Sequence, residues 1–269
     1  MNNIVAGQPE PCYNCSKDFD GLYCNHCGQK KFDRQDFNIK EFSKEFADDL
    51  FDFDSKIFNT LKLLVLKPGK LTIDYISGKQ RTYISPVKLY LVIITVNFLV
   101  YSFFDNYSPI ESSYLLQLGN IDWVNNVLQT KIQKSGITQE AFFHELNLAA
   151  NNAFSISLYF IIFIFAFVLK LYYFKKGRFY IEHLIFCLYF MSFGFLRDTL
   201  CLPLYMINKD IAVFIGISTT LIYFYLSIKP VYGNSGILRV VNSILLYGIF
   251  FSLFSIAIVF SIIGALLAM

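Results

Sequence analysis

Five apolar stretches constrain the fold of this 269-residue chain more than any other feature. Each is long enough to cross the hydrocarbon core of a bilayer, which is about 30 Å thick and needs roughly 20 helical residues. We predict transmembrane helices at residues 86–104, 153–172, 181–204, 211–228 and 240–267. The third stretch contains polar residues near its end, and the fifth is longer than an untilted crossing needs. The pattern predicts an all-α integral membrane protein.

The composition agrees with this fold class. Hydrophobic residues make up 55% of the chain and charged residues only 16%, whereas soluble domains contain about 45–50% and about 25% of these classes. The net charge of +3 is small, so we expect no nucleic-acid partner. Membrane lipids are the partners that the composition favours, and homo-oligomers are compatible with it.

Four cysteines near the N-terminus form two C-x-x-C pairs: Cys12, Cys15, Cys24 and Cys27. Two such turns can place four thiolates around one tetrahedral ion, so we predict a zinc ribbon with a structural Zn²⁺. Gly28 is suited to the positive φ that such a turn often needs. Two disulfides, a redox-active C-x-x-C pair and an iron site are the competing interpretations. His26 could replace one sulfur, but with four cysteines present we expect it to be a bystander.

A helical stretch with one apolar face follows the ribbon. From Ile39 to Leu64, apolar residues recur every three or four positions, and charged residues lie mostly on the other side. Asn38 and Glu41 resemble a capping box at its start, and Pro68-Gly69 is a stop signal at its end. We predict that this amphipathic juxtamembrane helix lies either on the membrane interface or on the cytosolic surface of the membrane domain.

These features divide the chain into three parts. They are a zinc ribbon with a basic linker at 1–34, amphipathic juxtamembrane helices at 35–85, and a membrane domain at 86–269. An external loop at 105–152 separates the first two predicted spans. In this loop we predict a break at Ser135-Gly136 and a helix that runs from Thr138 into the second span.

Lysine and arginine residues set the predicted orientation. They gather before the first span, in the turn after the second span and around the turn after the fourth. The opposite side has only Lys131, Lys134 and Lys209. The N-terminus is therefore expected in the cytosol and the C-terminus outside. A reducing cytosol favours a metal over disulfides at the four cysteines.

The order of short motifs resembles that of an uncharacterised bacterial family. The chain contains C-x-x-C…C-x-x-C-G-Q-K, then F-D-F-D-S-K-I-F-N-T-L-K-L-L, K-P-G-K and D-Y-I-S-G-K-Q-R-T-Y-I-S-P-V-K-L-Y. From Cys12 to about Phe104 it is similar to a family of Bacteroidota type, domain of unknown function 3667; Glu182-His183 and residues 223–232 fit more loosely. The resemblance implies a zinc ribbon joined to several spans in a bacterial inner membrane, and carries over no catalytic residue.

The chain contains no complete catalytic motif. His144-Glu145 begins like a zinc-protease site, but Leu148 stands where the second histidine is required. There is no phosphate-binding G-x-x-x-x-G-K-[ST] loop and no G-x-S-x-G elbow. We leave enzymatic activity undecided and favour a function without catalysis.

Ionisable residues near the membrane are the remaining candidates for a ligand site. Glu182 and His183 lie at the predicted cytosolic start of the third span, and Arg197 and Asp198 lie about 24 Å further, near the outer interface. A substrate or proton path competes with a structural role at the helix ends, which we favour. A second group precedes the first span and suits anionic headgroups or a phosphate-bearing ligand, although ordinary membrane anchoring also explains it. It consists of Lys79, Arg81, Tyr83 and Lys88.

We therefore expect an adaptor, scaffold or sensor in the inner membrane, whose zinc ribbon binds a cytosolic protein. The alternative is a transporter, or a protein that handles lipids or phosphate ligands with the ionisable residues above. Asn97, inside the first span, is expected to form a hydrogen bond between helices.

Overall fold

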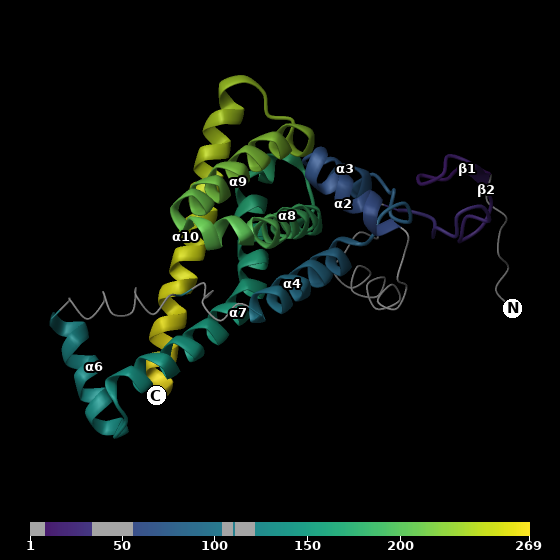
Figure 1. Cartoon of the computed structure of the whole chain (residues 1–269). Coiled ribbons are helices and arrows are strands. Elements are labelled where there is room, and N and C mark those ends of the chain that lie inside the picture. The colour runs from purple at the N-terminus through teal and green to yellow at the C-terminus, as the bar shows by residue number, and fades with distance from the viewer. Residues whose placement is uncertain (1–8, 34–55, 104–109, 111–121) are drawn as a thin grey trace, which may run out of the picture. The chain divides into compact units, whose positions relative to one another are not determined.

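The computed structural model describes residues 9–33, 56–103, 110 and 122–269, and helices dominate it (Figure 1). The elements are β1 (Glu10–Pro11), β2 (Asp18–Phe19), α2 (Lys56–Leu66), α3 (Lys70–Ile76), α4 (Pro86–Ser102), α6 (Asp122–Ser135), α7 (Gln139–Tyr172), the 3₁₀ turn η2 (Phe174–Lys176), α8 (Tyr180–Ile207), α9 (Lys209–Tyr232) and α10 (Gly236–Ala268). The two short strands pair antiparallel, with Glu10 opposite Phe19. The predicted all-α class is confirmed.

Four of the described helices, α7 to α10, are long and apolar enough to cross a membrane. The prediction of five spans is not shown, because α4 is apolar but has only 17 residues. The predicted helix from Thr138 into the second span is confirmed, since α7 continues unbroken for 34 residues. Gly136, at φ 70°, separates it from α6.

The chain forms two compact units. The first unit contains Met1–Phe98 and Ala166–Tyr247, and the second contains Leu99–Phe165 and Gly248–Met269. Within the second unit, ring pairs join α7 to α10: Phe154 with Phe254 at 5.3 Å and Phe165 with Phe250 at 5.1 Å between centroids. The division into three parts proposed from the sequence stays a prediction.

The core of the first unit surrounds the N-terminal half of α8. Every residue from Ile181 to Phe193 is buried, because α2, α3 and α9 pack against this helix (Figure 1). The ring of Phe224 on α9 contacts Phe186 at 5.8 Å and Phe190 at 5.2 Å. This half of α8 is therefore enclosed by protein on all sides.

The predicted juxtamembrane helix is described only from Lys56 onward. The part of it before residue 56 lies outside the described residues. Within α2, Thr60 and Leu64 are buried, but Phe58, Val65 and Leu66 are exposed. A single apolar face is therefore not confirmed, and the described part rests on protein, with α2 against α3 and α8.

A glycine in the left-handed region joins α2 to α3. Gly69 has φ 79°, and a Cβ at this position would lie 2.9 Å from the carbonyl oxygen of Ser227 on α9. The K-P-G-K segment thus brings α3 directly against the backbone of α9. The helix that follows is almost wholly buried: Leu71, Thr72, Asp74, Tyr75 and Ile76.

Candidate functional site

The four cysteines predicted as metal ligands come together in the head, which we define as residues 9–33. Their Sγ atoms all lie within 4.8 Å of one another, and the closest pairs, Cys12–Cys27 and Cys15–Cys24, are 3.6 Å apart. Four sulfurs at about 2.3 Å from a tetrahedral ion would be about 3.8 Å from each other. The arrangement could therefore hold one metal ion. All six cysteines, each of which the structure describes, are free.

Two matching turns hold these cysteines. The backbone N–H of Ser16 donates to the carbonyl of Cys12, and that of Gly28 donates to the carbonyl of Cys24, both at 2.8 Å. In each turn, the residue that follows the second cysteine has a left-handed backbone conformation, with φ 61° at Ser16 and 69° at Gly28. The positive φ predicted for Gly28 is confirmed. His26 is exposed and lies outside the four-sulfur group.

Gln29 follows the second turn and joins the head to the helical body. Its side chain is buried, and its Nε2 donates to the carbonyl oxygen of Gly78. Its Oε1 accepts from the backbone N–H groups of Gln80 at 3.3 Å and Arg81 at 3.4 Å. One side chain thus satisfies three backbone groups of the clamped loop, our name for residues 77–85 between α3 and α4.

A second contact between the head and the clamped loop comes from the first cysteine turn. The Oδ1 of Asn14 accepts from the N–H of Thr82 at 3.1 Å and from its hydroxyl at 2.7 Å. Gly78 packs so closely on the head that a Cβ there would lie 2.9 Å from Tyr13 and 3.0 Å from Phe32. Both cysteine turns therefore hold the same loop.

The basic and aromatic residues predicted as a ligand site lie on or beside this loop. Lys79 and Arg81 are exposed on it, and Lys88 is half-buried in the first turn of α4. Tyr83 is half-buried and already has a partner within the protein. Of the four, Lys79 and Arg81 are the ones that the structure leaves exposed to a ligand.

Tyr83 belongs to a group of three interacting polar side chains, together with Asp74 and Lys70 of α3. Its hydroxyl donates to Oδ2 of the buried Asp74 at 2.9 Å, and Lys70 pairs with the same oxygen at 2.8 Å. Burial, then the hydrogen bond and the charge of Asp74, raise the pKa of Tyr83 to about 12. The hydroxyl therefore remains a protonated donor at neutral pH.

Glu182 and His183 are buried at the start of α8. The Oε2 of Glu182 accepts from the N–H of Phe179 at 3.0 Å and lies 3.9 Å from Arg178, which is the geometry of an acidic residue that stabilises a helix N-terminus. The Nδ1 of His183 lies 2.9 Å from the Tyr232 hydroxyl, and the two rings are stacked. The Nε2 of His183 has no hydrogen-bond partner in the described part of the chain.

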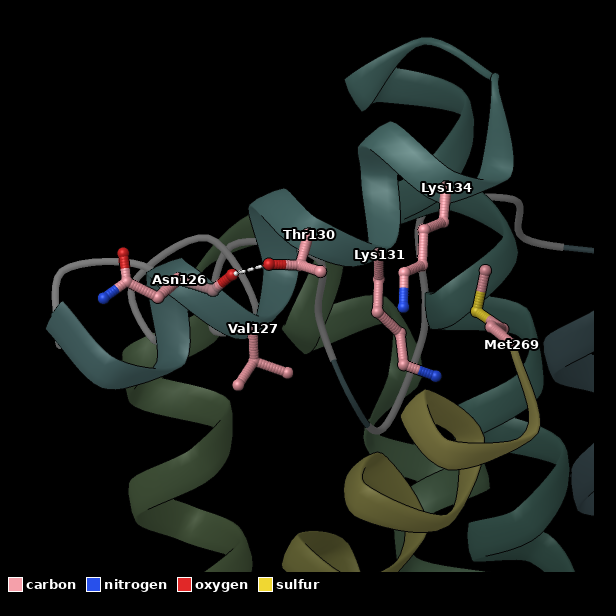
Figure 2. A pocket seen from close by; sticks show the side chains of 6 residues that line it. All are labelled: Asn126, Val127, Thr130, Lys131, Lys134 and Met269. Atoms are coloured by element: carbon pink, nitrogen blue, oxygen red, sulfur yellow. Dashed lines mark hydrogen bonds between the residues drawn. The ribbon is translucent and has the colours of Figure 1, made fainter.

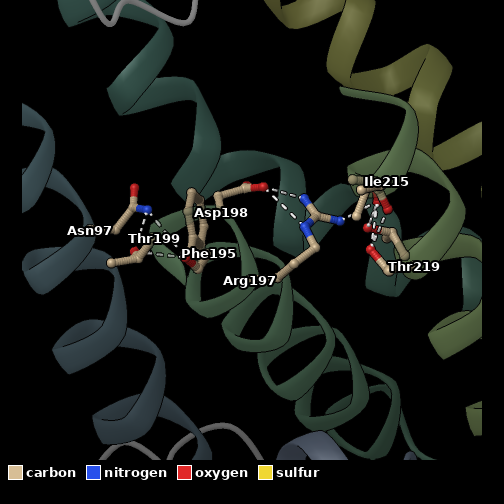
Figure 3. Close-up of polar contacts among 9 residues, drawn as sticks. Asn97, Phe195, Arg197, Asp198, Thr199, Ile215 and Thr219 are labelled. Carbon is tan, nitrogen blue, oxygen red and sulfur yellow. Dashed lines mark hydrogen bonds and ion pairs between the residues drawn. The ribbon is translucent and has the colours of Figure 1, made fainter. Parts of the chain in front are cut away.

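Arg197 and Asp198 form an ion pair in the second half of α8 (Figure 3). The Nε of Arg197 lies 3.0 Å from Oδ1 of Asp198, and its Nη1 donates to the carbonyl oxygen of Gly216 on α9 at 2.6 Å. The hydroxyl of Thr220 also donates to that carbonyl, at 2.8 Å. These contacts connect α8 to α9 through polar groups.

Asn97 connects α4 to the same part of α8. Its Nδ2 donates to the carbonyl oxygen of Phe195 at 3.2 Å and to the hydroxyl of Thr199 at 2.8 Å (Figure 3). The predicted hydrogen bond between helices is therefore confirmed. Together with the Arg197 contacts, it forms a polar cluster shared by α4, α8 and α9.

Two lysines of α6 lie beside the C-terminal end of α10 in the second unit (Figure 2). The Nζ of Lys131 donates to the carbonyl oxygen of Leu266 at 2.6 Å, where the helix dipole favours a cation. Lys131, Lys134 and Met269 line a cavity of about 400 Å³ with three residues of α6 (Figure 2). The hydrogen bond to Leu266 gives Lys131 a structural role within the loop that we predict to be external.

A family resemblance covers the middle of the first unit. Residues 54–98 match the profile of a family described as "Protein of unknown function (DUF3667)". The similarity predicted from the motifs is thus confirmed for that segment, which contains α2, α3, the clamped loop and most of α4. The comparisons found no match among the curated proteins or the solved structures.

Three residues that position the DUF3667-like segment escaped the sequence reasoning. Gln29 holds the clamped loop, Asp74 anchors Tyr83, and the hydroxyl of the buried Thr60 accepts from the N–H of Ile84 at 3.2 Å. The available signal was that Thr60 and Asp74 are polar residues flanked by apolar residues of the same helix. For Gln29 it was the position directly after the second cysteine turn.

Proposed function

We propose that this chain is a scaffold or sensor in a bacterial inner membrane, with a cytosolic head that holds a structural Zn²⁺ and binds a cytosolic protein. The observation that carries the proposal is the closed group of four sulfurs. Four sulfur ligands leave no open coordination position for catalysis. Beside them, Leu22 is 65% exposed and Tyr23 is 61% exposed, and tyrosine is among the residues enriched at protein interfaces.

The surroundings of the head support a cytosolic location. Tyr13 of the head lines one cavity together with Lys176, which precedes α8, and Gly233, which follows α9. The head and both turns therefore lie at the same end of the first unit, and basic turns face the cytosol by the positive-inside rule. We count α4 as a fifth span of about 25 Å, which places the C-terminus outside.

We expect a photo-crosslinking amino acid at Tyr23 to capture a defined cytosolic protein in intact cells. The Leu22→Ser variant should lose most of this cross-link while keeping one zinc per purified chain, because it removes apolar contact area and no metal ligand. Lys17, exposed elsewhere on the head, is the control position for the cross-linker. Equal capture at both positions, or none at either, would contradict the scaffold proposal.

The polar cluster in α8 favours a second candidate function, a transporter or a protein that handles lipids or phosphate ligands. The hydroxyl of Tyr189 donates to the carbonyl of Ile84 at 3.4 Å, so α4 begins well beyond the start of α8. Arg197 lies about 12 Å further along α8 than Tyr189. We place the start of α4 at the cytosolic edge of the membrane. Arg197 and Asp198 then lie inside the hydrocarbon core of the bilayer, which is about 30 Å thick, and charged residues there usually mark an ion or substrate path.

Proton flux tests this alternative. If it is correct, a proton gradient should acidify the lumen of proteoliposomes that contain the wild-type protein, as reported by a pH-sensitive dye inside them. The Asp198→Asn variant should remove most of this proton flux. Asp210→Asn, which neutralises an exposed carboxylate at the start of α9, should leave it unchanged. A wild-type protein without flux above protein-free liposomes would count against a proton path.

A further inference from the structure

The cavity between α6 and the C-terminal end of α10 lies within the second unit (Figure 2). Its volume of about 400 Å³ is in the range of small-molecule sites, about 300–1,000 Å³. Met269 and five residues of α6 line it: Asn126, Val127, Thr130, Lys131 and Lys134. The described lining therefore contains two cations and no acidic side chain.

Both lysines of this lining can donate to a ligand. Their side chains extend from α6 toward the end of α10 (Figure 2). Lys134 is exposed and forms no ion pair with any residue that the structure describes. The ammonium group of Lys131 donates to the carbonyl oxygen of Leu266 at 2.6 Å, which leaves two of its three N–H donors for other acceptors. The cavity thus presents two ammonium groups that no described carboxylate neutralises.

The cavity lies at the level of a membrane surface. We place the start of α4, beside Tyr189, at one edge of the hydrocarbon core. The rings of Phe190, Phe224 and Tyr247 follow one another from α8 to α10 with centroids 5.2 and 6.5 Å apart, so Tyr247 lies near the same edge. Leu266 is 19 residues further along α10, or about 28 Å. That distance reaches the opposite edge of a core of about 30 Å, where lipid headgroups begin.

Apolar side chains beside the two lysines suit the acyl chains of a lipid. Val127 and Met269 belong to the lining itself, and Val127 is 41% exposed. The last turns of α10 expose Ile263 and Leu267, which are four residues apart and therefore share one face of the helix. An amphiphile with an anionic headgroup can use both kinds of contact, whereas a small soluble anion can use only the lysines.

We infer that this cavity binds the headgroup of an anionic phospholipid, such as phosphatidylglycerol, in the leaflet that contains the C-terminal end of α10. The phosphate contacts the ammonium groups of Lys134 and Lys131, and the acyl chains lie along the exposed apolar side chains of α10. A zwitterionic headgroup is disfavoured, because its own ammonium group would meet no carboxylate in the described lining. The inference goes beyond the proposed function, since it needs neither the head nor a protein partner.

The test is native mass spectrometry of the detergent-purified full chain, with phosphatidylglycerol or phosphatidylcholine added at equal concentration. We expect phosphatidylglycerol to be retained more strongly. Lys134→Gln should lower its retention about fivefold, the scale of one lysine beside an anionic lipid. Lys134→Arg keeps the charge and should keep the preference. Lys17→Gln is the matched control, because Lys17 is an exposed lysine of the head and its loss changes the net charge equally.

Four outcomes would overturn the inference. Equal retention of the two lipids would show that the site does not select an anionic headgroup. Equal losses in Lys134→Gln and Lys17→Gln would assign a general effect of net charge, and equal losses in Lys134→Gln and Lys134→Arg would assign a structural role to Lys134. Displacement of phosphatidylglycerol by inorganic phosphate at the same concentration would assign a soluble anion. Because Lys134 is exposed, we expect an unchanged melting temperature for both of its variants.

Discussion

Gly69→Ala is expected to destabilise the first unit by about 2–5 kcal/mol, since it combines backbone strain with a steric clash. The residue has φ 79°, a region that alanine adopts only at a cost of about 1–2 kcal/mol. The new Cβ would lie 2.9 Å from the carbonyl oxygen and 3.2 Å from the Cα of Ser227, and 2.8 Å from Cγ of Pro230. Two of these are backbone atoms of α9 and cannot rotate away.

Thermal unfolding of the detergent-purified protein measures this effect. Gly136→Ala is the matched control: Gly136 has φ 70°, and no described atom lies within 4 Å of its added Cβ. The control should show only the strain, so Gly69→Ala should unfold roughly 5 °C lower than the control. Equal melting temperatures for the two variants would show that α3 does not pack on α9 as described.

The features that were predicted correctly depend on neighbouring residues in the sequence. The apolar stretches, the break at Gly136 and the left-handed Gly28 follow from hydropathy and from backbone preferences within a few positions. The length of α4 was overestimated because hydropathy continues past Ser102, where the helix ends. The span count therefore depends on a boundary that composition alone does not define.

The contacts that were missed join distant parts of the chain. Gln29 bonds to backbone groups of Gly78, Gln80 and Arg81, and no local pattern indicates which loop a glutamine will meet. For the same reason, the burial of Glu182 was not predicted, because α2, α3 and α9 cover the first half of α8. Burial by elements from elsewhere in the sequence has no hydropathy signature in α8 itself.

Cys24→Ser is expected to lose the metal ion that we propose for the head, and to release the clamped loop from the head. A closed four-cysteine site gains its stability from the metal, so the head should unfold when one sulfur is removed. Gln29 is held in place by the bond from the N–H of Cys24 to its carbonyl at 2.8 Å. Once the head unfolds, the amides of Gln80 and Arg81 lose their acceptor. Their hydrogen exchange should rise about tenfold or more.

Gln29→Leu separates the contact from the metal. It keeps all four sulfurs but removes the acceptor, so exchange at the clamped loop should rise while one metal ion per chain remains. Cys201→Ser, a half-buried cysteine of α8 outside the head, should change neither quantity. If Cys24→Ser loses the metal and the loop keeps its protection, the head and the body are not coupled. If both Cys24→Ser and Gln29→Leu free the loop, the buried amide is the link through which the metal state of the head reaches the start of α4.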